Sequence, residues 1–252
     1  MINFFINFNI RISLTLDQLF PVTYKLDGNK FFSEQVLKSI VPKNAIVYEI
    51  GGGSQPHLSL EAKQALGSRI VGIDIEKEEL LSALDGIYDE IIEADICQYQ
   101  GKQDADVVIC RATLEHVCDM PGAIKAIAST LKLGGRAYIF APCKNALFAR
   151  LNLLLPQKLK VAILYKLFPH KALGHDGFPA FYHKCTPSEI AQLCVKHQLA
   201  IVDTKHFWVS SYFYVFVPAY LIWRIYQSIL KLVLRDDACE TFYCVLEKSG
   251  EI

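Results

Sequence analysis

Apolar runs alternate with helical patterns between residues 45 and 141, and this alternation constrains the fold more than any other feature of the chain. Each run suits one buried strand, and the segments between the runs have helical periodicity. The expected strands are residues 45–50, 69–73, 90–94, 106–110 and 136–141, and the expected helices are residues 56–66, 76–84 and 121–131. Strands that alternate with helices form βαβ units, so we expect a parallel sheet with helices on both faces.

Further elements flank this alternating region. A short amphipathic helix is expected over residues 31–41. A second helix should begin at Thr186-Pro187-Ser188-Glu189, because proline near the first turn and an acid within it are helix-start signals. Residues 199–208 and 241–247 are candidates for the sixth and seventh strands.

The 252 residues suit a single domain with insertions. In this interpretation residues 45–141 form the ligand-binding core. Residues 142–185, after the fifth strand, and residues 209–235, between the sixth and seventh strands, are helical insertions that form a lid or a membrane-facing surface.

Glycines and acidic residues gather at the ends of the first three strands. Gly51-Gly52-Gly53 follows the first strand, which contains Glu49, while Asp74 ends the second strand and Asp95 follows the third. The glycines let the backbone turn tightly and approach a ligand closely. An acid at the end of the second strand can accept hydrogen bonds from ribose hydroxyls, so a nucleotide-like ligand is expected at this edge of the sheet.

Two common nucleotide motifs fit this turn poorly. A dinucleotide fingerprint requires a third glycine where this chain has Pro56, and no Lys-Ser or Lys-Thr pair follows the glycines as in a P-loop. A nicotinamide-dependent reductase is therefore a less favoured alternative.

Five segments resemble motifs of the class I S-adenosylmethionine-dependent methyltransferases, namely residues 47–53, 71–75, 93–96, 106–117 and 131–136. The resemblance implies a Rossmann-like α/β fold with one seven-stranded sheet whose last strand is antiparallel, and S-adenosylmethionine as the cofactor. Residues 148–187 are similar to methyltransferases that are common in bacterial biosynthetic and surface-polysaccharide pathways.

The same resemblance implies cofactor contacts. Matching by motif, Glu49, Gly51 and Gly53 hold the methionine end of the cofactor. Arg111 lies beside its carboxylate and sulfonium.

The nucleoside end of the cofactor is implied to contact four further residues. Asp74 binds the ribose and Asp95 binds the adenine amine, while Ile75 and Ile96 pack on the adenine ring.

Two histidines are candidate catalytic bases. In methyl transfer the cofactor supplies the reactivity, and the protein supplies alignment and, for a hydroxyl acceptor, a base. His116 follows the fourth strand and should face the acceptor, and His175 lies in the insertion expected to cover it. Both favour oxygen as the acceptor atom, although Glu115-His116 could instead cap or orient the next helix.

The first insertion is basic and apolar. From Pro142 to His175 it has six Lys or Arg residues and no Asp or Glu. Such a cover suits a small, amphipathic or lipid-linked acceptor.

The second insertion contains a predicted basic amphipathic helix, in which Arg224 and Lys231 recur at helical spacing opposite an apolar side. Two interpretations remain open: the basic residues contact an anionic membrane surface, or the helix packs internally as a lid. A transmembrane helix is not expected, because the uncharged run is short and Pro218 interrupts it.

Charge and cysteine usage narrow the function classes. Lys and Arg number 26, as do Asp and Glu, and a zero net charge argues against nucleic-acid binding. Residues 1–141 carry 13 basic and 18 acidic residues, and residues 142–252 carry 13 basic and 8 acidic residues. The eight cysteines have no metal-ligand spacing, so we expect free thiols in a reducing compartment and no metal site.

Together these patterns predict a cytoplasmic methyltransferase that uses S-adenosylmethionine, with the membrane surface as an alternative location. No signal peptide is expected, since the apolar start of the chain lacks a basic region before it and a small-residue cleavage site after it. The main alternative is a non-catalytic, membrane-docked nucleotide-binding protein.

Overall fold

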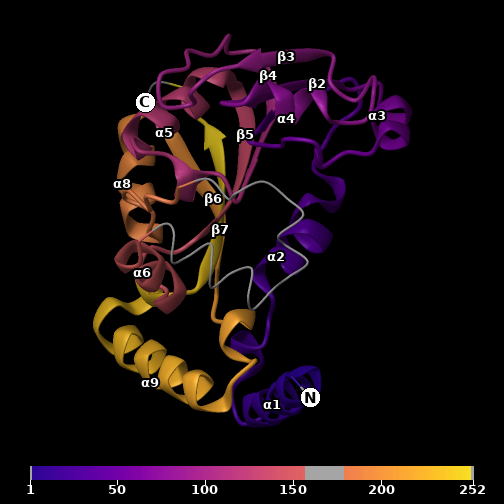
Figure 1. Cartoon of the computed structure of the whole chain (residues 1–252). Helices are drawn as coiled ribbons and strands as arrows, with labels where there is room; N and C mark the ends of the chain where they lie inside the picture. The colour runs from indigo at the N-terminus through magenta and orange to yellow at the C-terminus, as the bar shows by residue number, and fades with distance from the viewer. Residues whose placement is uncertain (1, 157–178, 251–252) are drawn as a thin grey trace.

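The computed structural model describes residues 2–156 and 179–250, and one seven-stranded sheet lies at its centre (Figure 1). The strands are β1 (Ile46–Ile50), β2 (Arg69–Asp74), β3 (Glu90–Glu93), β4 (Ala105–Arg111), β5 (Leu131–Pro142), β6 (Leu199–Phe207) and β7 (Thr241–Lys248). Their order is β3-β2-β1-β4-β5-β7-β6. β7 is antiparallel to β5 and β6, and the other pairs are parallel, which confirms the expected sheet.

Four helices occur close to where the sequence predicts them: α3 (Leu60–Leu66), α4 (Lys77–Leu81), α5 (Met120–Thr130) and α8 (Pro187–Lys196). α8 begins as expected, because the Thr186 hydroxyl accepts a hydrogen bond from the Glu189 N–H at 3.3 Å. α3 begins later than expected, because Ser59 is its N-cap and accepts from the Ala62 N–H at 3.2 Å.

The core has one apolar cluster on each face of the sheet. Ile124 of α5 and Ile190 of α8 belong to the larger cluster, together with Val108 of β4. The neighbouring β4 residue Val107 points to the other face, where it meets Phe32.

Residues 28–39 cover this second face with an irregular helical segment. It comprises α2 (Gly28–Phe31), a π-helical turn (Phe32–Val36) and a 3-10 turn (Leu37–Ser39). Asp27 caps its start by accepting from the Lys30 N–H at 2.8 Å. The helix expected over residues 31–41 therefore begins and ends earlier.

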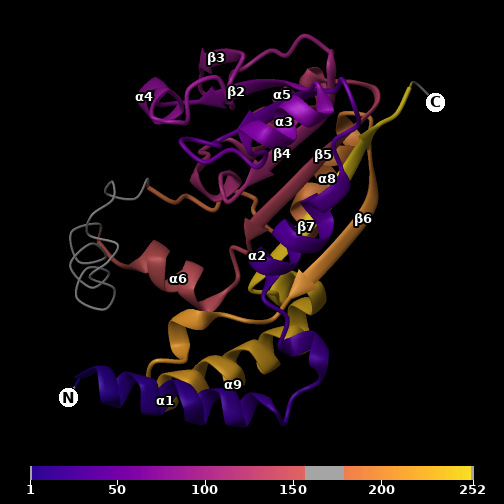
Figure 2. The same ribbon diagram turned by 90° about the vertical axis from the view of Figure 1, so that its right-hand side faces the viewer.

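The remaining helices lie around one end of the sheet. α6 (Leu147–Leu154) follows β5 and α9 (Val217–Leu234) separates β6 from β7, as expected for the two insertions. α1 (Ile2–Asp17) was not predicted, and it lies side by side with α9 along the lower edge of the molecule (Figure 2). Short 3-10 helices occur at Val22–Tyr24, Leu114–His116, Ser211–Phe213 and Arg235–Ala238.

α9 is amphipathic as predicted, but its orientation is opposite to the one in which basic residues contact a membrane. Arg224 and Gln227 are 4% and 2% exposed, whereas Ile225 on the other side is 61% exposed. Pro218 lies in the first turn and begins the helix instead of interrupting it. No helix in the described ranges is long and apolar enough to cross a membrane.

Candidate active site

The candidate site lies at the carboxyl ends of β1, β2 and β4, where the glycine turn follows β1. Gly51 and Gly53 have φ angles of +67° and +50°, a region that favours glycine. A Cβ on Gly51 would lie 2.2 Å from the Thr113 hydroxyl oxygen, so side-chain crowding also excludes larger residues. The Thr113 hydroxyl donates to the Ile50 carbonyl at 3.2 Å and joins the loop after β4 to this turn.

Glu49 is a buried carboxylic acid directly beneath the turn. One of its oxygens accepts the His57 N–H at 2.8 Å. Burial raises the pKa of Glu49 to about 7, although this hydrogen bond and the Arg111 charge act in the opposite direction. Glu49 therefore titrates near neutral pH.

Arg111 lies at the end of β4 and lines the same small cavity as Glu49. Its guanidinium donates to the Ser33 hydroxyl at 3.1 Å, which ties it to the helical segment 28–39. The cavity measures about 50 Å³, and its lining is Leu37, Glu49, Ile50, Gly51, Gly52, Gln55, His57, Ile109 and Arg111. An acid and a guanidinium thus meet at one small hollow, which suits a group that carries both charges.

Backbone hydrogen bonds bring the ends of β1, β2 and β3 together. The Gly51 N–H donates to the backbone carbonyl of Ile73, and the Ala94 N–H donates to the backbone carbonyl of Asp74. Asp74 is half-buried, and burial raises its pKa. One of its oxygens accepts the Glu76 N–H at 3.1 Å, and one Asp95 oxygen accepts the Cys97 N–H at 2.9 Å.

The two isoleucines next to these acids differ in exposure. Ile75 is 57% exposed and so offers an apolar surface at the edge of the sheet. Ile96 is almost completely buried in the larger core cluster.

His116 lies after β4, in the 3-10 helix Leu114–His116. Its N–H donates to the Thr113 carbonyl, so it is one step from the glycine turn. The ring Nδ1 lies 3.1 Å from the Pro179 carbonyl oxygen, which can only accept, so Nδ1 carries the proton and Nε2 the lone pair of the neutral ring. The other candidate base, His175, lies outside the described residues.

Glu115 is a second buried acid that sequence reasoning did not single out. Its Oε1 lies 3.8 Å from His116 Nε2, and burial raises its pKa to about 8. Its carbonyl accepts from the N–H groups of Phe181 and Tyr182, so residues 181–182 are held against the loop after β4. The adjacent pair Glu115-His116 was the only sequence signal for this acid. The burial of Glu115 itself involves residues 181–182, which are far away in the sequence.

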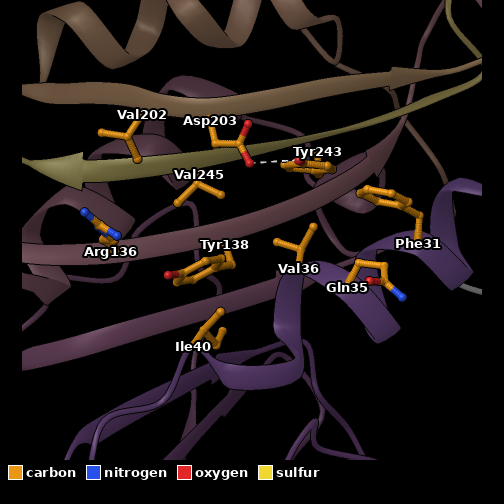
Figure 3. A pocket seen from close by; sticks show the side chains of 10 residues that line it. All are labelled: Phe31, Gln35, Val36, Ile40, Arg136, Tyr138, Val202, Asp203, Tyr243 and Val245. Carbon is orange, nitrogen blue, oxygen red and sulfur yellow. Dashed lines mark hydrogen bonds between the residues drawn. The ribbon is translucent and has the colours of Figure 1, made fainter.

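A larger hollow lies elsewhere in the described part of the chain. It measures about 440 Å³ and lies between the helical segment 28–39 and the strands β5, β6 and β7 (Figure 3). Asp203 and Tyr243 share a hydrogen bond of 2.8 Å at its wall. It contains none of the expected cofactor residues.

The eight cysteines all lie in the described ranges and all are free, with six of them buried. Within the same ranges, no group of three or more His, Cys, Asp or Glu side chains is placed to hold a metal ion.

The strand order, the antiparallel β7 and the glycine turn define a class I S-adenosylmethionine-dependent methyltransferase. A sequence model described as a methyltransferase domain matches residues 29–203, which is more than half of the chain. The chain belongs to this methyltransferase family and is an enzyme that uses S-adenosylmethionine. This assignment favours neither a non-catalytic protein nor a nicotinamide-dependent reductase.

Curated relatives include two ubiquinone biosynthesis O-methyltransferases. The one from Aeromonas salmonicida is 28% identical over 153 residues, which cover 58% of this chain and 60% of the relative. The one from Colwellia psychrerythraea is 29% identical over 162 residues, which cover 62% of this chain and 60% of the relative. The matched region thus spans about 60% of the length of these relatives.

Solved structures share the fold at low identity. The geranyl diphosphate C-methyltransferase from Streptomyces coelicolor superposes with a TM-score of 0.54 and 12% identity, and the match covers 87% of this chain and 79% of that one.

Proposed function

We propose that this methyltransferase acts on an oxygen atom of a small, amphipathic or lipid-linked acceptor. The observation that carries the proposal is the position of His116 after β4. Its backbone N–H donates to the carbonyl of Thr113, and the Thr113 side chain packs on Gly51 of the glycine turn. Its Nδ1 is held by a carbonyl, so the lone pair belongs to Nε2. The two relatives named as O-methyltransferases support oxygen as the acceptor atom.

His116 would serve as the general base. The bound cofactor supplies an electrophilic methyl group on a sulfonium. Nε2 of His116 would accept the hydroxyl proton of the acceptor as the acceptor oxygen takes up the methyl group. His175 remains a second candidate for this role.

The methionine end of the cofactor is proposed to bind Glu49, Gly51, Gly53 and Arg111. The buried Glu49 carboxylate suits an ammonium group, and the Arg111 guanidinium suits a carboxylate. Both glycines adopt positive φ angles, which allow the tight turn that would place its backbone close to the ligand.

The nucleoside end is proposed to bind the next two strand ends. Asp74 would accept hydrogen bonds from the ribose and Asp95 would accept one from the adenine amine. The exposed Ile75 and the small exposed edge of Ile96 would pack on the adenine ring.

The insertions are proposed to select the acceptor, around a cofactor-binding core of residues 45–141. Residues 142–185 would cover the acceptor, and residues 209–235 would face a membrane. The enzyme would then be a cytoplasmic protein that is peripheral at the membrane.

The test is a labelled-methyl assay with phenols that differ only in the presence of a prenyl chain. We expect methyl ethers as products, with higher turnover on the prenylated phenol. His116→Gln should lower kcat by about 10²–10⁴-fold without changing the affinity for S-adenosylmethionine. His197→Gln, at the end of α8, is the matched control and should retain kcat. Products methylated on carbon, or an unchanged kcat in His116→Gln, would show that the proposed chemistry is wrong.

A further inference from the structure

Helices α1 and α9 have an inverted distribution of polarity. Among the described side chains of α1, the buried ones are Asn9, Ser13 and Asp17, which recur every four residues along one side. The buried side of α9 combines Arg224 and Gln227 with the aromatic side chains of Tyr220 and Trp223. Helices on a protein surface in water normally bury an apolar stripe and expose polar residues, so α1 departs from that pattern on its buried side, and α9 departs from it by burying a charge and exposing aliphatic side chains.

The buried polar side chains form hydrogen bonds between the two helices and to the segment that precedes α9. Arg224 forms an ion pair with Asp17 at 2.6 Å and donates to the Trp208 carbonyl at 3.0 Å. Asn9 accepts the Val217 N–H at 3.0 Å, and the Ser13 hydroxyl donates to the Tyr214 carbonyl at 3.2 Å. Rotating either helix to hide its apolar side would break these bonds and leave a buried charge without its partner.

The outward side of α9 is apolar, and we call this side together with the exposed phenylalanines of α1 the base face; α1 also exposes Asn7, Arg11 and Thr15. The main side chains of the base face are Phe4, Phe8, Ile222, Ile225, Ile229 and Leu232. Exposure reaches 78% for Phe4 and 87% for Leu232. The Phe5 and Phe216 rings, 6.4 Å apart, join the two helices at one end, and both helices lie along the same edge of the molecule (Figure 2).

The charge pattern of the base face favours a lipid bilayer over a protein as its partner. The two charged residues of α9, Arg224 and Lys231, both turn toward Tyr24 and Trp208. The Ser228 hydroxyl, also on α9, donates to the Arg224 carbonyl of its own helix. A protein interface uses about one hydrogen bond per 100–200 Å², and this side of α9 offers almost nothing to form them.

Polar side chains between helices and aliphatic side chains outside them are the arrangement found where helices contact hydrocarbon. Arg11 is exposed on α1, and Arg235 is exposed just after α9. Long basic side chains at such positions can reach lipid phosphates while the apolar side chains enter the bilayer.

We propose that α1 and α9 lie flat in the interface of a lipid bilayer and insert the base face into it. The attachment is mainly apolar, so it needs no anionic lipid and persists at high salt. This inference deepens the proposed peripheral location and rests on the proposed function only for its link to the acceptor.

That link runs through α6. Leu151 and Leu154 are exposed on α6, which directly follows β5 beside the candidate site. α6 packs on α9, and the Tyr226 hydroxyl donates to the Asn145 carbonyl just before α6 at 3.0 Å. The exposed leucines of α6 thus lie on a helix that packs on α9, where they would contact a lipid-linked acceptor.

The test is flotation of the full chain with phosphatidylcholine vesicles at low and high salt. We expect binding at both salt concentrations. Ile225→Ser combined with Ile229→Ser should weaken vesicle binding by about 100-fold, since returning each side chain to water costs roughly tenfold in partitioning. Val195→Ser combined with Leu84→Ser is the matched control, because these side chains are as exposed but lie on α8 and after α4.

Three results would overturn the inference: no vesicle binding, binding only to anionic vesicles at low salt, or a dimer in solution that the isoleucine variants abolish. S-adenosylmethionine binding and turnover of a soluble phenol are measured on the same variants. Isoleucine variants that lose vesicle binding but keep both activities would support this inference independently of the lipid-linked acceptor. A native chain that transfers methyl groups but does not bind vesicles would refute this inference and leave the proposed methyl transfer intact. Vesicle binding without any methyl transfer would leave the base face in place and refute the proposed function.

Discussion

Cofactor binding should release a proton from Glu49. This side chain is only 4% exposed, and burial raises its pKa to about 7. In the proposed complex a cationic ammonium group lies against the carboxyl group. A nearby cation favours the ionised form, so the pKa of Glu49 should fall when the cofactor binds.

The size of the effect follows from proton linkage. At pH 6 a carboxyl group with a pKa near 7 is about 90% protonated, so binding should release up to about 0.9 proton, and at pH 8 only about 0.1. The affinity for S-adenosylmethionine should therefore increase by up to about tenfold per pH unit below pH 7 and level off above it.

Isothermal titration calorimetry in buffers of different ionisation enthalpy measures this proton number directly. Glu49→Gln keeps the hydrogen-bonding shape but cannot ionise, so its proton release and its pH dependence below pH 7 should both disappear. A native chain that releases no proton at pH 6, or a Glu49→Gln variant that releases as many, would refute the reasoning.

Three further substitutions test Asp74, Glu115 and Asp17. Asp74→Ala should weaken S-adenosylmethionine binding by about 10–100-fold in the same titrations, because the ribose hydroxyls lose an acceptor, and the exposed Asp85→Ala should not. Glu115 has a pKa of about 8 in the folded chain against an ordinary 4.5. The native state thus binds more protons than the unfolded state between these values, and the free energy of unfolding should fall as pH rises from about 5 to 8. Urea denaturation should show a flatter decline for Glu115→Gln. Asp17→Ala should cost about 3–5 kcal/mol in the same assay, because it leaves Arg224 buried without its partner, and an unchanged midpoint would contradict the buried ion pair.

Strands were predictable because their signal is local. β1, β2 and β4 are buried apolar runs, and the glycine after β1 and the acid at the end of β2 mark those two strand ends without reference to the rest of the chain. The same locality explains why the acids Asp74 and Asp95 could be expected at one edge. Once β2 and β3 are placed side by side in a parallel sheet, their carboxyl ends and therefore these two acids lie at the same edge.

The acid–base properties of the site were not predictable in this way. Glu49 and Glu115 are ordinary acids in the sequence, and their raised pKa values come from burial. The burial of Glu115 involves Tyr182, which is far away along the chain and whose N–H donates to the Glu115 carbonyl. A local pattern can identify such residues as candidates, but the pKa depends on tertiary packing.

The orientation of α9 shows the same limit and gives it a physical meaning. Periodicity states that the two sides of a helix differ in polarity, but it does not state which side faces the protein. Here the choice is made by Asp17, which is 207 positions from Arg224, and by Glu240, which accepts from Trp223 at 2.6 Å. These partners hold the polar side inward, so the apolar side must face outward. A folded chain that keeps so many aliphatic side chains in water would lose their burial energy, whereas at a bilayer surface the same orientation satisfies both sides of the helix. The polar contacts of α1 and α9 therefore form the base face when the chain folds. The surface is then available for docking before any lipid is present.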